Sequence, residues 1–168
     1  MLCEFLRSRS IPLLALCALA PVLHAQNCTG TIHTNVTTVS ISTGGVQRLD
    51  LSVAPSQINL GWQVIGAYGT DHPIPMFADA GLRLNNDRYL FRMYTGHAGF
   101  VRGGVTGFLG GPLVPFDAQG HAQLQVVIPT GLPSTFIGRT LHHGMYRTDP
   151  IVLLPECGTG TVPLTLVP

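Results

Sequence analysis

The feature that most constrains the fold of this chain is the alternation of apolar and polar side chains along short stretches. In RLDLSVA, the apolar residues Leu49, Leu51 and Val53 are separated by single polar residues. The stretches AQLQVVIP (122–129) and TVPLTLVP (161–168) show the same period of two. Successive side chains of a strand point to opposite faces of a sheet, so this period predicts β-strands that bury one face.

Turn-forming segments separate these stretches. The chain contains 20 Gly and 13 Pro, many of them between the apolar stretches, as in residues 42–45 and 129–133. In DAQG, Asp117 is expected to cap its own backbone in a tight hairpin turn. Arg88–Tyr94 is interpreted as a strand rather than as a helical turn. Seven or eight short antiparallel strands at this spacing predict an all-β fold, a single β-sandwich of the jelly-roll or Ig-like kind.

Three local features refine this prediction. The apolar phase shifts between Val36 and Val39, which indicates a bulge or a corner. Pro163 cannot donate a hydrogen bond to a neighbouring strand, so the last strand is expected at a sheet edge. Trp62 shares its strand face with Leu60, and this face is predicted to be core.

The N-terminal segment has the pattern of a secretory signal peptide. Arg7 and Arg9 precede the apolar run IPLLALCALAPVL, and the small residue Ala25 follows it. The run is shorter than the roughly 20 residues that a helix needs to span a bilayer. We therefore expect a signal peptide over residues 1–25, one domain over 26–168, and no membrane span after cleavage. The expected location is secreted, cell-surface or periplasmic, in a bacterium.

The cysteines fit an exported protein. Cys3 and Cys17 lie in the predicted signal peptide, where bulky Leu16 disfavours the alternative of a lipid-modified Cys17. Cys28 and Cys157 remain, near the two ends of the mature chain. An oxidising compartment favours a disulfide bond between them over free or intermolecular thiols. Such a long closed loop would stabilise the fold by about 5 kcal/mol, less any strain.

Composition excludes some classes of partner. Nine basic residues, all of them arginine, balance eight acidic residues, so the net charge is near zero. A neutral chain has no electrostatic reason to bind nucleic acid or anionic lipid. The chain is 45% hydrophobic and 10% charged, which is not the composition of a disordered segment.

No catalytic or metal-binding motif is evident, and we expect no catalytic residue, no metal and no cofactor. Adjacent histidines in TLHHGMYR are the main exception to examine. Residues on one strand alternate in direction, so His142 and His143 cannot both bind one metal. His143, on the side of Leu141 and Met145, is expected to be buried and hydrogen-bonded, with His142 on the outer face.

Two further groups of residues are candidates for a ligand site. Asp71 and His72 lie in the proline-rich loop YGTDHPIP, and loops often carry function. Tyr68, with Tyr89, Tyr94 and Trp62, could form an aromatic platform for a sugar, although the alternation around Trp62 favours a core position for that residue. The candidate ligand-site residues are thus Asp71, His72, His142 and Tyr68.

Several stretches together resemble a family of uncharacterised secreted β-domains of planctomycetes and other large-genome bacteria. In that family an LxLNxDxY stretch is followed by a DxxG hairpin, a PxGLP loop and a GxTLHH strand. The matching stretches here are STGGVQRLDLSV, GTDHPIP, LRLNNDRYLF, FDAQGHAQLQVVIPTGLPSTFIGRTLHHGMY and VPLTLVP. The resemblance implies an exported module, alone or at the end of a larger protein, and no activity or site residue comes with it.

We therefore expect an exported, non-enzymatic β-sandwich with a structural or interaction role at the cell surface, where its partner is an envelope protein or a glycan. A carbohydrate-binding module is the first alternative, and it requires at least two coplanar exposed aromatic rings. A metal-dependent hydrolase is the second. It requires two or more of the following residues to converge: Asp71, His72, Asp79, His97 and His121.

Overall fold

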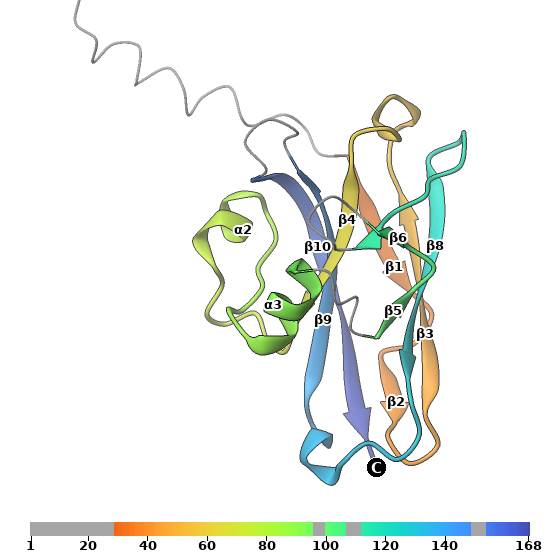
Figure 1. Cartoon of the computed structure of the whole chain (residues 1–168), viewed down its shortest axis with the longest axis vertical. Coiled ribbons are helices and arrows are strands. Elements are labelled where there is room, and N and C mark those ends of the chain that lie inside the picture. The colour runs from red at the N-terminus through yellow and green to blue at the C-terminus, as the bar shows by residue number, and fades with distance from the viewer. Residues whose placement is uncertain (1–28, 96–99, 107–111, 149–153) are drawn as a thin grey trace, which may run out of the picture.

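Two β-sheets pack face to face around one apolar core (Figure 1). The computed structural model describes residues 29–95, 100–106, 112–148 and 154–168. The first sheet has the strand order β1 (Thr31–Thr34), β3 (Gly45–Ser52), β8 (His121–Ile128) and β5 (Val101–Arg102). The second has the order β2 (Thr38–Ser40), β10 (Pro155–Val167), β9 (Thr140–Thr148), β4 (Trp62–Ala67), β7 (Pro112–Leu113) and β6 (Val105–Thr106). The predicted all-β sandwich is confirmed.

The strands differ from the prediction in number and in one pairing. The described part of the chain contains ten strands rather than seven or eight. Three of them, β5, β6 and β7, have two residues each, which is too short for an alternating pattern to be visible. Neighbouring strands are antiparallel except that β2 runs parallel to the end of β10. The two sheets thus enclose the core mainly through the longer strands.

The alternation read from the sequence corresponds to burial in the core. Leu49 of β3 lies opposite Leu124 of β8, and both side chains are fully buried. Arg48 and Asp50, on either side of Leu49 in the strand, face outward and form an exposed ion pair, with Nε and Oδ2 3.1 Å apart. Burial of a leucine side chain contributes roughly 1.5–3 kcal/mol, so these positions hold the sheets together.

The predicted corner is where the chain changes sheets. Strand β1 belongs to the four-stranded sheet, and β2, only a few residues later, belongs to the six-stranded sheet. Gln47 of β3 is completely buried beneath this crossing. Its amide Nε2 donates to the carbonyl oxygens of Val36 at 2.8 Å and Pro163 at 2.9 Å. This single side chain therefore ties the corner to β10.

The predicted edge position of the last strand is wrong. Strand β10 lies between β2 and β9. Proline is tolerated there because β2 pairs only with Thr165–Val167, beyond Pro163. On its other side Pro163 lies opposite His142 of β9. At Pro163, β10 pairs with β9 alone. The proline therefore indicates a position without a second neighbouring strand and does not indicate an edge strand.

Strand β4 is buried along its whole length, and Trp62 is a core residue as predicted. Its indole Nε1 donates to the carbonyl of Gln57, at the end of the 3-10 turn η2 (Pro55–Gln57), at 3.1 Å. Leu60, however, is 41% exposed, so its predicted core position is wrong. The chain turns at Gly61, whose φ of +67° interrupts the alternation between the two residues.

Two short α-helices in the described residues extend from the sandwich. Helix α2 (Pro75–Asp79) lies beside the six-stranded sheet, on the side away from β3 and β8 (Figure 1). Its Phe77 meets the ring of Tyr146 of β9 edge-on, with centroids 5.4 Å apart. This contact covers Tyr146 on the outer face of β9, and Leu82 lies against Gly144 of the same strand, so this part of β9 is buried on both faces.

The second helix, α3 (Arg88–Tyr94), corrects the prediction of a strand in this segment. Asp87 is its N-cap, and Oδ1 accepts from the backbone N–H groups of Tyr89 at 2.9 Å and Leu90 at 3.0 Å. These bonds satisfy two donors that a helix start otherwise leaves unpaired. Leu90 and Met93 are buried, which anchors the helix.

The predicted turn at Asp117 is confirmed. Its Oδ1 accepts from the backbone N–H groups of Gln119 at 2.9 Å and His121 at 2.8 Å. Gly120 has a φ of +83°, as such a turn requires. The turn does not close a hairpin, because β7 and β8 on its two sides belong to different sheets.

Two predictions about export fall outside the described residues. The predicted signal peptide over residues 1–25 and Cys28 both lie there. Cys157, the predicted partner of Cys28, is buried on β10 at 6% exposure. No helix in residues 29–95 or in the later described segments is long and apolar enough to cross a membrane.

Candidate binding site

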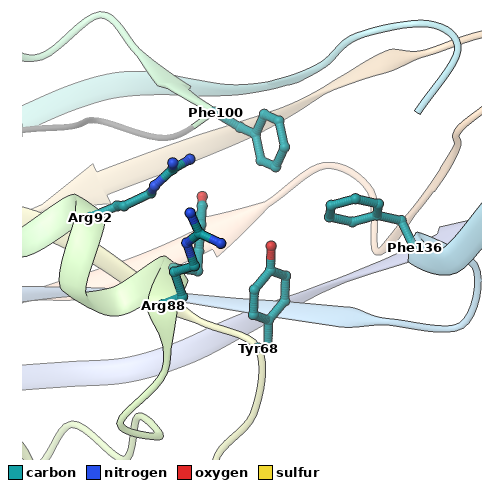
Figure 2. A pocket seen from close by; sticks show the side chains of 6 residues that line it. Tyr68, Arg88, Arg92, Phe100 and Phe136 are labelled. Carbon is teal, nitrogen blue, oxygen red and sulfur yellow. The ribbon is translucent and has the colours of Figure 1, made fainter. Parts of the chain in front are cut away.

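A pocket of about 370 Å³ opens where α3, the end of β4 and two loops meet. Figure 2 shows two arginine side chains extending from α3, with Phe136 on the opposite side and the Tyr68 hydroxyl directed between them. The residues that line the pocket are Tyr68, Arg88, Tyr89, Arg92, Phe100 and Phe136. Four segments that are distant in the sequence therefore build one site.

Asp87 fixes the position of α3, which carries the two arginines, relative to Tyr68. Its Oδ1 caps α3, and its Oδ2 accepts from the backbone N–H of Tyr68 at 2.6 Å. Arg88 and Arg92 are four residues apart on α3, so they lie on the same side of the helix. One carboxylate thus fixes the start of α3 against the end of β4.

Tyr89 forms the floor of the pocket and is buried. Its ring lies 5.4 Å from Tyr68 and 6.0 Å from Phe100, measured between centroids. The planes are tilted by 40° and 32°. The aromatic rings therefore gather in one cluster, but they are not coplanar as the sugar platform of the first alternative requires.

The Tyr89 hydroxyl reaches into the sandwich and pairs with His143. The distance from Oη to Nε2 is 2.9 Å, and the two rings meet edge-on. Gly66 of β4 allows this approach. A β-carbon there would lie 2.7 Å from Cδ2 of His143 and 2.9 Å from Cε1 of Tyr89. The pocket floor is thus anchored to β9 across a strand position that lacks a side chain.

Phe136 closes the opposite side of the pocket, at the end of the 3-10 turn η3 (Ser134–Phe136). From the same loop, the Arg139 guanidinium lies over the Tyr68 ring, 5.5 Å from its centroid. Its Nε donates to the carbonyl of Thr135 at 3.1 Å. This hydrogen bond holds the guanidinium in place for a cation–π contact with Tyr68.

Positive charge converges on the pocket. Burial raises the pKa of Tyr68, and the Asp87 carboxylate raises it further, whereas the charges of Arg139, Arg92 and Arg88 lower it. Arg88 and Arg92 are exposed, and neither forms an ion pair with any residue that the structure describes. Their guanidinium groups are therefore available to an anion.

His143 confirms the interpretation of the double histidine. It is fully buried on β9, whereas His142 is half-buried, and the two side chains alternate along the strand. Burial lowers the pKa of His143 to about 3, with a smaller contribution from the charge of His142. The ring is therefore neutral at ordinary pH and serves as a partner for Tyr89. Its Nδ1 has no hydrogen-bond partner within the described residues.

The other predicted ligand-site residues lie elsewhere. Asp71 and His72 form an exposed ion pair, with Nδ1 and Oδ2 2.8 Å apart. Asn85 orders their loop, because its Nδ2 donates to Asp71 Oδ1 at 2.6 Å and its Oδ1 accepts from the His72 backbone N–H at 2.7 Å. Neither residue lines the pocket, and neither does His142, so of the four candidates only Tyr68 does.

No group of three or more His, Cys, Asp or Glu side chains in the described segments could hold a metal ion. Of the five residues named for a hydrolase, His97 lies outside those segments. Arg88, Arg92, Phe100 and Phe136 were not predicted as site residues. A sequence signal that could have indicated the two arginines is Asp87 as an N-cap, since a helix start there places both on one side of the helix; no signal in the sequence indicated Phe100 or Phe136.

Comparisons with known proteins add little. No protein-family model and no curated protein matches the chain. One similar solved structure is HBP35 of Porphyromonas gingivalis, with a TM-score of 0.48 and 8% identity over 83% of this chain and 41% of that chain. Another is the human F-spondin reeler domain (fragment 2), with a TM-score of 0.45 and 13% identity over 82% of this chain and 92% of that chain. This chain thus spans less than half of the HBP35 chain, and at these scores neither likeness bears on function.

Proposed function

We propose that this chain is an exported, non-enzymatic β-sandwich module that binds a component of the cell surface through the pocket at α3. The observation that carries the proposal is the pocket itself, which combines aromatic walls with two exposed arginines that form no ion pair with any described residue. Export is supported by the N-terminal pattern and by the family resemblance described above. Both remain predictions.

The walls of the pocket suit binding better than proton transfer. Arg88 and Arg92 present N–H donors and no acceptor, so they offer no base to a reacting group. Burial raises the pKa of both Tyr68 and Tyr89, which keeps the two hydroxyls protonated. General acid–base catalysis works best when a group has a pKa near the working pH, and the lining residues offer none.

The support of the pocket residues by the surrounding structure also suits ligand binding. Its side chains come from a capped helix, a buried strand end and a loop that Arg139 braces. The aromatic side chains are held in place, so they lose little conformational entropy when a ligand binds, which favours affinity. The exposed side chains of Arg88 and Arg92 become ordered only on the ligand, whereas the backbone that carries them is already fixed.

The experiment is co-sedimentation of the purified exported protein with envelopes of the producing cells. Phe136→Ala removes one wall of the pocket, and Arg92→Gln removes one charge from an exposed side chain. The matched control is Ile137→Ala, which truncates an exposed apolar side chain next to Phe136. Thermal unfolding of each variant separates lost binding from lost fold.

We expect the wild-type protein and Ile137→Ala to sediment with envelopes, and both pocket variants to remain largely in solution. If Arg92→Gln and a folded Phe136→Ala both sediment as much as the wild type, the pocket is not the binding surface. No sedimentation of the wild type would overturn the proposed role at the envelope.

A further inference from the structure

We infer that the α3 pocket recognises an anionic saccharide, with a hexuronate ring against the aromatic walls and its carboxylate on Arg88 and Arg92. The inference rests on the proposed function and adds the chemical class of the ligand. It follows from the hydrogen-bonding character of the lining residues, from their aromatic surface and from the placement of the two arginines.

The hydrogen-bonding groups of the pocket are almost entirely donors. Arg88 and Arg92 each present several N–H donors and no acceptor, and the remaining polar groups are the hydroxyls of Tyr68 and Tyr89. The Tyr89 hydroxyl is already paired with His143. No carboxylate or carboxamide side chain is among the lining residues. Two cationic donor groups, with no acidic side chain among the lining residues, favour a ligand that brings a charged acceptor, which a uronate carboxylate does and a neutral sugar does not.

Asp87, at the start of α3, contributes a negative charge that is felt at Tyr68, but its carboxylate oxygens are bonded to backbone N–H groups. Asp87 directs both carboxylate oxygens to backbone N–H groups, Oδ1 to the first turn of α3 and Oδ2 to Tyr68. Its lone pairs are therefore used inside the protein. The two guanidinium groups on α3 form planar forks that match a carboxylate, and such charge-assisted bonds are among the strongest in proteins.

The aromatic surface selects for a ring with an apolar face. Tyr68 and Phe136 are half-buried and line the pocket on different sides (Figure 2). The tilts of 40° and 32° among Tyr68, Tyr89 and Phe100 leave no pair of parallel rings between which a flat aromatic ligand could be sandwiched. The flat platform of coplanar rings that the first alternative required is therefore absent among these three residues, but a pyranose ring held inside a pocket needs only one aromatic face for its C–H groups, and Tyr68 or Phe136 offers one. The combination of such faces with two cations matches a uronate unit.

The test measures binding of trigalacturonate to the full exported protein by isothermal titration calorimetry. Its fully methyl-esterified form is the neutral ligand of the same shape. The double variant Arg88→Gln/Arg92→Gln removes the two pocket charges. The control Arg48→Gln/Arg83→Gln removes two exposed charges from residues that do not line the pocket, so the change in net charge is the same.

We expect trigalacturonate to bind wild type and control equally, and the double variant to bind at least about tenfold more weakly. The methyl ester should bind about tenfold more weakly than the acid, and added salt should weaken only the acid, because exposed charges are screened. Equal binding of acid and ester would overturn the anionic assignment, and equal competition by benzoate would overturn the saccharide assignment.

The same inference fails if no anionic saccharide binds while the pocket variants still lose envelope sedimentation. That result would leave the proposed function standing with a different ligand. If no anionic saccharide binds and the pocket variants also sediment like the wild type, the pocket is not a binding surface. The two proposals therefore fail in distinguishable ways.

Discussion

At the scale of single residues, the buried pair of Tyr89 and His143 connects the pocket to the core. The pair joins α3 to β9 through one hydrogen bond of 2.9 Å. Sequence alternation was enough to predict that His143 is buried and His142 is not, because strand geometry alone decides direction. The identity of the partner could not be predicted, because Tyr89 is 54 residues away in sequence.

Replacement of His143 by alanine should destabilise the domain. The change leaves the buried Tyr89 hydroxyl without its partner, which costs about 1–3 kcal/mol, and it also opens a cavity. His142→Ala, on the half-buried side of the strand, should cost clearly less. Urea unfolding of both variants checks this expectation, and a larger loss from His142→Ala would contradict it.

His143 should also make the stability of the protein depend on pH. Burial lowers its pKa from 6.5 to about 3 in the folded state, so between these values the unfolded chain binds a proton that the folded chain does not. Stability is therefore fully present above about pH 6.5 and falls as the pH drops through that window. The nearby His142, whose pKa burial also lowers, acts in the same direction.

The measurement compares the free energy of unfolding at about pH 7 and pH 5, above the range where carboxylates titrate. The wild type should lose stability over this interval. His143→Gln should lose much less, whereas His142→Gln should keep most of the dependence. A wild type with equal stability at both values would refute the role given to the buried imidazole.

At the scale of elements, α3 is a helix that the pattern of apolar and polar residues did not predict. The alternating stretches predicted the long strands well, since each is flanked by turn residues and buries one face. Seven residues of α3 contain only two helical turns, and its buried residues Tyr89, Leu90 and Met93 do not display a full helical period. The local signal for a helix is Asp87 as an N-cap, but aspartate at such a position is equally typical of an ordinary turn.

Asp87 should therefore contribute more to stability than a surface carboxylate does. Asp87→Ala removes the cap and the bond to the Tyr68 N–H, and loss of a cap alone costs about 0.5–2 kcal/mol. Asp87→Asn has only one carbonyl oxygen, so it can keep the cap or the Tyr68 bond, not both. We expect it to fall between alanine and wild type.

The control for Asp87 is Asn86→Ala, at the exposed position just before the cap. Thermal unfolding of the three variants tests the order. If Asp87→Ala melts at the same temperature as Asn86→Ala, the carboxylate does not fasten α3 to β4 as described here.

At the scale of the whole molecule, the sandwich was predictable and the pocket was not. The two sheets follow from apolar alternation and turn spacing, which are local signals. The pocket is assembled from the end of β4, from α3, from Phe100 and from the loop of Phe136, which no spacing in the sequence connects. Tyr68 was singled out as an aromatic residue, and its neighbours in space became evident only in three dimensions.

The predicted disulfide bond between Cys28 and Cys157 belongs to this scale, because it would close nearly the whole domain. Mass mapping of the protein purified from an oxidising compartment, without reductant, should find one cross-linked pair of peptides. Removal of the disulfide bond by Cys28→Ser/Cys157→Ser should lower the free energy of unfolding by about 2–5 kcal/mol. Two thiols that both react with an alkylating reagent in the native protein would contradict the bond.

The most direct test of the pocket as the binding surface is arginine labelling with phenylglyoxal, in the free protein and in protein bound to envelopes. Peptide mass mapping then gives the labelling rate of each arginine without knowledge of the ligand. Arg88 and Arg92 should be protected several-fold on binding, while the exposed Arg48 and Arg83 should label at unchanged rates. Protection of Arg48 or Arg83, with Arg88 and Arg92 labelled as fast as in the free protein, would contradict the assignment of the α3 pocket.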